Sequence, residues 1–173
     1  THKVVSKYIF ETLNFDRSLI PVEDFPRPMK KFGNRARIVN LTMTKPHFFW
    51  KEFPLFEFKV NILDKVVSEV EFGFAINADN GSRIFTHESE KAYEIDESRS
   101  LAVKVSISEP LLVPGKYYIS LGVRSHVETL DAVDNYLEFD VVDVDKDNNH
   151  YGFSLGSEIS GHIFSKVKAE IQS

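Results

Sequence analysis

The chain has 173 residues, 42% of them hydrophobic and 13% aromatic, so it is long and apolar enough to bury a core. Its formal net charge of -5 argues against nucleic-acid binding, which usually depends on a basic surface. The absence of cysteine excludes a disulfide framework and thiolate chemistry. No apolar run approaches the roughly 20 residues of a transmembrane helix and no signal peptide is recognisable, so direct membrane insertion is not expected.

Residues 1–34 differ in character from the rest of the chain and are predicted to form a linker. Val5, Ile9 and Leu13 recur at the spacing of a short amphipathic helix. Prolines concentrated between residues 16 and 29 then favour an extended connector. Because the chain starts at Thr1 rather than Met, we expect it to be a fragment that follows an upstream domain.

From residue 35 to residue 143 the hydrophobic period is two, which predicts β-strands. About seven or eight such runs, separated by turn residues, predict an all-β fold, an antiparallel immunoglobulin-like or jelly-roll-like β-sandwich. Asp79-Asn80-Gly81-Ser82 is a typical hairpin turn between two of the strands. The predicted inward-facing residues are Val39, Leu41, Met43; Phe56, Phe58, Val60, Ile62; Val70, Phe72, Phe74, Ile76; Leu101, Val103, Val105, Ile107; Tyr117, Ile119, Leu121, Val123; and Leu137, Phe139, Val141.

The last part of the chain, residues 144–173, lies outside this pattern. It begins in an acidic stretch, and a final apolar run at 159–167 is interpreted as one more strand, packed on the sandwich or on a partner. The acidic stretch does not fit a calcium loop, because Asn148 and Ser154 occupy the positions that need Gly and Glu. A solvated loop is the simpler interpretation.

Sequence motifs give little support to catalysis. Residues 152–156 spell G-x-S-x-G, but an acidic loop precedes the motif, Gly161 follows closely, and no α/β alternation surrounds it as a nucleophile elbow requires. The histidines show no metal-ligand spacing, and there is no P-loop. We therefore predict no catalytic residue, no metal site and no cofactor.

A binding face is the surviving candidate. The strand at 70–77 carries glycine, alanine and asparagine opposite its apolar set. If it lies beside the strand at 117–124, the small outward residues of both form a trough flanked by polar and aromatic side chains, a mixture that suits sugars. The alternative is an ordinary solvated sheet. The predicted carbohydrate-binding residues are Gly73, Ala75, Asn77, His87, Tyr118, Ser120, Gly122, Arg124 and Tyr136.

Three segments, FGFAINADNGSRIFT, LLVPGKYYISLGV and YLEFDVVD, carry a family resemblance. In this order they resemble the C-terminal domain of Wzt, the ATP-binding subunit of ABC transporters that export bacterial O-antigen polysaccharide. The matching features are the aromatic–glycine pair Phe72-Gly73, the turn Asn80-Gly81, and Pro114-Gly115 ahead of Tyr117. The resemblance covers residues 32–143, whereas the ending KVKAEIQS departs from the common family ending.

This resemblance implies a non-enzymatic carbohydrate-binding module that is cytoplasmic and membrane-associated through the transporter complex. It implies recognition of the completed O-antigen polysaccharide at its non-reducing end. It further implies an upstream nucleotide-binding domain, a membrane-spanning transporter subunit as partner, and a homodimer that exchanges a C-terminal strand. No individual contact carries over from the family, so the predicted site rests on the outward-face argument alone.

Two alternatives stay open on the sequence. An immunoglobulin-like structural or adhesive module would contact protein through a sheet edge, lie outside the cell and bind no glycan. An enzyme that uses Ser154 would lose turnover when that serine is replaced by alanine.

Overall fold

The computed structural model describes residues 20–49, 52–107, 112–142 and 144, and the backbone of 167–171; across these residues the fold is all-β, with no helix and hence none that is long and apolar enough to cross a membrane. The predicted fold class is confirmed. The strands are β1 (Ala36–Met43), β2 (His47–Phe49), β3 (Leu55–Ile62), β4 (Glu69–Ala78), β5 (Arg83–Glu88), β6 (Tyr93–Glu94), β7 (Ser100–Ile107), β8 (Gly115–Arg124), β9 (Thr129–Val142) and β10 (Val167–Ile171).

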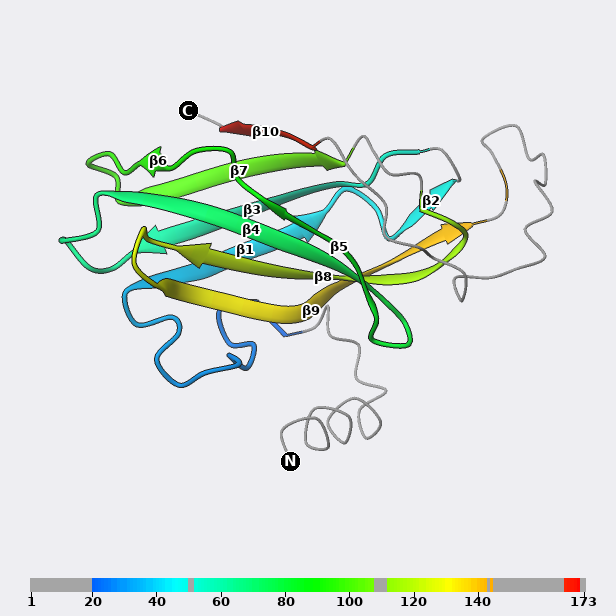
Figure 1. Ribbon diagram of the computed structural model, residues 1–173, viewed down its shortest axis with the longest axis horizontal. Coiled ribbons are helices and arrows are strands. Elements are labelled where there is room, and N and C mark those ends of the chain that lie inside the picture. The colour runs from blue at the N-terminus through cyan, green and yellow to red at the C-terminus, as the bar shows by residue number, and fades with distance from the viewer. Residues whose placement is uncertain (1–19, 50–51, 108–111, 143, 145–166, 172–173) are drawn as a thin grey trace.

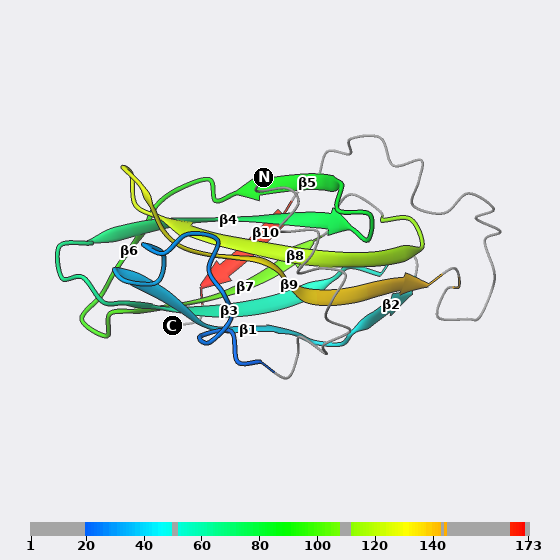
Figure 2. The same cartoon turned by 90° about the horizontal axis from the view of Figure 1, so that it is seen from below.

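The strands form two sheets that pack face to face, as Figures 1 and 2 show. One sheet has the order β1-β3-β7-β10, and the other has the order β2-β9-β8-β4-β5, with β6 paired to β4. All these pairs are antiparallel except β2 with β9, which is parallel. The sequence pattern did not predict β2 and β6, because two or three residues are too few to show alternation.

Aromatic residues fill the space between the two sheets. Phe56 and Phe58 of β3 contact Phe74 and Phe72 of β4 edge-on, each pair with ring centroids 5.1 Å apart. Such edge-to-face pairs add about 0.5–1.5 kcal/mol to the free energy gained by burying the rings. The alternation predicted for β3, β4, β7 and β8 matches the buried faces of these strands.

In β1 the predicted alternation is wrong at its first position. The register with β3 shifts between Ile38 and Asn40, so Val39 occupies an irregularity rather than a regular inward position. The buried residues of β1 are Ala36, Ile38 and Leu41. A strand irregularity adds one residue and reverses the facing of the positions before it, which an alternation count cannot reveal.

Residues 20–34, named here the N-terminal segment, pack beside β1 and β9 (Figure 1). Val22 belongs to the hydrophobic core. Phe25 meets the ring of Tyr136 edge-on at 5.0 Å, and the Tyr136 hydroxyl donates a hydrogen bond to the carbonyl of Ile20. The expected connector is therefore, over these residues, part of the folded unit.

At the other end of the chain, β10 adds to the edge of the first sheet by pairing with β7. It overlaps the strand expected at 159–167 only at Val167, and residues 159–166 lie outside the described residues. The expected helix at 5–13 and the G-x-S-x-G motif also lie outside them, as does the acidic stretch except for residue 144.

Candidate functional site

Small residues on the outer face of the second sheet form the floor of a groove. In the register of β4 with β8, Gly73 lies opposite Gly122 and Ala75 lies opposite Ser120. Ala132 of β9 continues the row on the far side of Gly122. Because paired residues project to the same face of a sheet, these five residues leave a shallow hollow across three strands.

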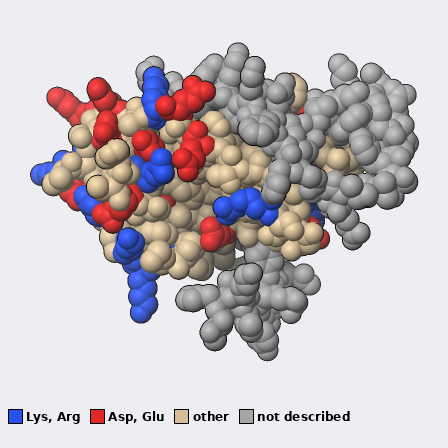
Figure 3. All heavy atoms as spheres, in the orientation of Figure 1, with Lys and Arg blue, Asp and Glu red and all other residues tan. Residues whose placement is uncertain are grey.

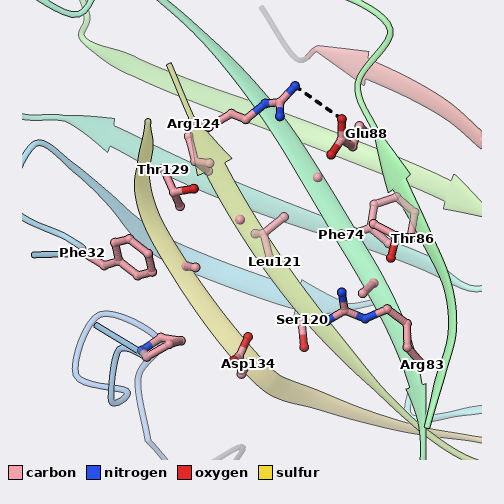
Figure 4. Close-up of a pocket in the computed structure, with 16 residues that line it drawn as sticks. Phe32, Phe74, Arg83, Thr86, Glu88, Ser120, Leu121, Arg124, Thr129 and Asp134 are labelled. Atoms are coloured by element: carbon pink, nitrogen blue, oxygen red, sulfur yellow. Dashed lines mark ion pairs between the residues drawn. The ribbon is translucent and has the colours of Figure 1, made fainter. Parts of the chain in front are cut away.

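Side chains from both sides turn this hollow into a cavity of about 360 Å³, within the range of small-ligand sites. Thr86 and Glu88 of β5 form one side. Pro28 and Phe32 of the N-terminal segment form the opposite side, as Figure 4 shows for Phe32. The half-buried Phe32 ring is thus an apolar wall beside a floor that lacks bulk.

A network of charges closes one end of the groove. The Arg124 Nε atom lies 2.6 Å from Glu71 Oε2, and its Nη2 atom lies 3.3 Å from Glu88 Oε2 (Figure 4 draws the second pair). Thr129 lies beside this end and adds a hydroxyl group. The arrangement offers hydrogen-bond donors and acceptors together, with its positive charge already matched.

Near the opposite end, a buried network of amides and a hydroxyl holds the strands in register. Asn77 Nδ2 donates to Ser120 Oγ at 3.0 Å and to Asn135 Oδ1 at 2.7 Å. The backbone N–H of Asn135 donates to Ser120 Oγ at 2.9 Å. Asn135 adopts a φ of 51°, which Asn tolerates better than most residues. The network fixes Ser120 in the groove lining.

Asp134 and Arg83 also line the groove near this end (Figure 4). Partial desolvation of its carboxyl raises the pKa of Asp134, and the charge of Arg83 acts in the opposite direction. Arg83 Nε also lies 3.5 Å from Asn77 Oδ1. As at the other end, a guanidinium and a carboxylate occupy the same neighbourhood.

The structure brings together five of the nine predicted site residues. The ones that line the groove are Gly73, Ala75, Ser120, Gly122 and Arg124.

The other four do not line it. Asn77 is 6% exposed and lies in the network near the end of the groove, and Tyr118, opposite Asn77 in register, is 8% exposed. His87 pairs with Phe74 and contacts its ring at 5.4 Å, so its side chain projects toward the core. Tyr136 packs against the N-terminal segment instead of forming a groove wall.

Several lining residues were missed from the sequence. Thr86 and Glu88 alternate along β5 and are detectable once that strand is paired with β4. Phe32 and Pro28 had no such signal, because they lie before the first strand, in a segment that looked like a connector. Among the described residues, no group of three or more acidic residues or histidines is arranged to hold a metal ion.

Comparison with known protein families decides what kind of domain this is. Residues 35–154 match the Wzt C-terminal domain, which is more than half of the chain. The chain belongs to the Wzt C-terminal domain family. The Wzt C-terminal domain is not a catalytic domain, which agrees with the prediction that this chain is not an enzyme.

Solved structures place this Wzt-family domain among known folds. The crystal structure of the C-terminal domain of Wzt is similar, with a TM-score of 0.50, 17% identity, and 62% of this chain and 74% of that chain covered. At this identity the similarity supports the shared fold. A comparison with curated protein sequences gives no match.

Two further structures are more distant. One is the Pseudomonas fluorescens alkylpurine DNA glycosylase AlkC bound to DNA with an abasic-site analogue. It has a TM-score of 0.44 and 15% identity, and the match covers 62% of this chain and 30% of that chain. The other is a CARDB domain of a Pyrococcus furiosus protein in complex with di-metal ions. It has a TM-score of 0.41 and 12% identity, and the match covers 76% of this chain and 100% of that chain. Neither score bears on the function of this Wzt-family domain.

Proposed function

We propose that this chain is a carbohydrate-binding module that recognises O-antigen polysaccharide for export by an ABC transporter, and that the groove over β4, β8 and β9 is its binding site. The observation that carries the proposal is the combination of an apolar wall, a floor without bulk and polar ends within one cavity. Sugar rings offer apolar C–H faces to an aromatic ring and hydroxyls to polar partners, so they need such a mixture.

The residues that line the groove have different roles in binding. Gly73, Ala75 and Gly122 admit the sugar ring close to the sheet, and Phe32 packs against one of its faces. Arg124 and the residues around Ser120 exchange hydrogen bonds with its hydroxyls. Asn77 acts indirectly, because it positions Ser120 through the hydrogen bond between them.

Membership of the family supports a proposal about the wider setting. We propose that the glycan is the completed polysaccharide, engaged at its non-reducing end, and that the domain works in the cytoplasm beside an upstream nucleotide-binding domain and a membrane-spanning subunit. In the single chain described here, β10 pairs with its own β7 along a sheet edge. The same edge accepts an identical strand from a second copy, so a homodimer with exchanged strands is part of the proposal.

Nuclear magnetic resonance titration of the chain tests the binding claim. The ligand is the O-antigen polysaccharide of the source strain, and an unrelated polysaccharide of similar length is the control. Saturable shifts of the Gly73, Gly122 and Phe32 amides with the cognate polysaccharide alone are expected. Equal shifts with both, or none with either, contradict the proposal. Light scattering reports the mass of the assembly, and a monomeric mass at every concentration contradicts the dimer.

A further inference from the structure

The charges around the groove are matched within the protein, and this has a consequence for the ligand. Arg124 is held by two carboxylates, with Nε 2.6 Å from Glu71 and Nη2 3.3 Å from Glu88. The guanidinium keeps N–H donors for neutral hydroxyls, but its single positive charge is already matched by two carboxylates, so little net attraction is left for an incoming anion. An anionic group at this end also meets the negative charge of both glutamates.

The second arginine of the groove is balanced as well. Arg83 and Asp134 both line the cavity, and the charge of Arg83 acts on the Asp134 carboxyl. The lining therefore contains two guanidinium groups and two carboxylates, those of Glu88 and Asp134, and Glu71 adds one more negative charge just outside it. The sum leaves no excess of positive charge for a phosphate or a uronic acid.

The surface around the groove supports the same conclusion. In the view of Figure 3, acidic and basic side chains are interspersed on the left of the face, and uncharged areas lie between the few charged side chains nearer the centre. Among the described residues of this face, basic side chains are not gathered into a patch that would attract an anionic ligand. The rest of the lining is neutral, with small residues below and Phe32 at the side.

We infer that the groove selects an uncharged stretch of glycan and discriminates against sugars that bear phosphate or carboxylate groups. This inference rests on the proposed function and specifies the chemical class of its ligand. Like charges brought together at an interface act as a repulsive element against the wrong partner. Here the repulsion of an anionic sugar comes from the carboxylates of Glu71, Glu88 and Asp134. The hydroxyls of a neutral sugar still find hydrogen-bond donors and acceptors at both ends of the groove.

Calorimetric titration of the whole chain with matched oligosaccharides tests the inference. The probes are neutral oligosaccharides prepared from the O-antigen polysaccharide of the source strain, and the same oligomers carrying a phosphate on one primary hydroxyl or oxidised to the uronic acid. We expect at least one neutral oligomer to bind, and its anionic counterparts to bind at least tenfold more weakly. Tighter binding of an anionic oligomer than of its neutral counterpart overturns the inference and leaves the proposed function standing. No binding by any oligomer overturns both.

A charge-removing variant asks whether the carboxylates cause the discrimination. In the double variant Glu71→Gln/Glu88→Gln, Arg124 is freed, and the ratio of anionic to neutral affinity should rise at least tenfold. Glu57→Gln is the matched control, because Glu57 is an exposed residue of β3 in the other sheet, and its ratio should not change. An unchanged ratio in the folded double variant overturns the inference; if that variant does not fold, the ratio measured on the unmodified chain still decides.

Discussion

Arg27 and Asp131 form a bidentate ion pair that attaches the N-terminal segment to β9. Arg27 Nε and Nη2 lie 2.8 and 3.0 Å from the two carboxylate oxygens of Asp131, and the side chains are 7% and 0% exposed. Asp131 also accepts a hydrogen bond from the Ile38 amide at 2.7 Å, which adds β1 to the cluster. The pair therefore ties the N-terminal segment and the neighbouring β1 to β9, about a hundred residues further on. Next to Phe32, the Gly33 amide donates to the Leu130 carbonyl at 3.0 Å and attaches the same segment to β9.

Replacing Asp131 should destabilise the domain severely. Asp131→Ala leaves the Arg27 charge and the Ile38 amide without their partner, and breaking a buried pair costs about 3–5 kcal/mol of unfolding free energy. Urea unfolding followed by circular dichroism measures the loss. Lys116→Ala is the control, because it breaks an exposed 2.6 Å pair with Glu138 and should cost less than about 1 kcal/mol. Equal losses in the two variants contradict the structural role of the pair.

Gly122→Val should block the groove and leave the fold intact. A Cβ atom at Gly122 meets only the Gly73 carbonyl, at an ordinary 3.9 Å, and valine suits a strand. We expect glycan affinity to fall at least about tenfold, which corresponds to about 1.4 kcal/mol.

The control for this variant is Gly81→Ala. Gly81 has a φ of +81° in the hairpin turn, so alanine should cost about 1 kcal/mol of stability there without touching the groove. Comparison of the two variants separates glycan binding from stability, since Gly122→Val should lose binding and Gly81→Ala should lose stability. Retained affinity in a folded Gly122→Val variant argues against the groove as the binding site.

Phe32→Ala should weaken glycan binding about tenfold, because it removes the apolar wall against which a sugar ring packs. Phe53→Ala tests the effect of losing an aromatic ring elsewhere, since Phe53 is 48% exposed and does not line the groove. Calorimetric titration of both variants with the same polysaccharide measures the difference. If both lose affinity equally, the effect is not specific to the wall.

The phenol of Tyr117 should lose its proton at a higher pH than an exposed tyrosine does. Burial raises the pKa of its phenol to about 12, and its hydroxyl donates to the Val113 carbonyl at 2.6 Å. Because the folded pKa lies above the unfolded value near 10, its contribution to stability is complete below about pH 10 and declines as the pH rises toward 12. Ultraviolet titration of phenolate formation should show one late phenol that is missing in Tyr117→Phe. If the latest transition persists in that variant, the assignment is wrong.

Much of the second sheet was predictable, because strand alternation is a local property of the chain. The inward residues of β4 and β8 alternate with a period of two, and the turn at Asn80-Gly81 joins two strands that pair in the structure. Once β4 and β8 are assumed to be neighbours, their outward residues must share a face. That is why Gly73, Ala75 and Gly122 were identified as the floor.

The walls were not predictable in the same way, because they depend on contacts between distant segments. Opposite Ser120, β9 carries an irregularity over residues 134–136, where Asn135 takes a positive φ. Tyr136 packs beyond it against Phe25 of the N-terminal segment, so the expected aromatic wall is engaged elsewhere. Phe32 takes that place from a part of the chain without strand periodicity.

The sequence by itself determined the β-sandwich, the inward faces of β3, β4, β7 and β8, and the small residues at the floor of the groove, because side-chain size and alternation are local properties of each strand. Only the tertiary structure decided which outward residues share one cavity, because that follows from strand order and register. Only the tertiary structure paired Arg124 with Glu71 and Glu88, since charges act through space and not along the chain.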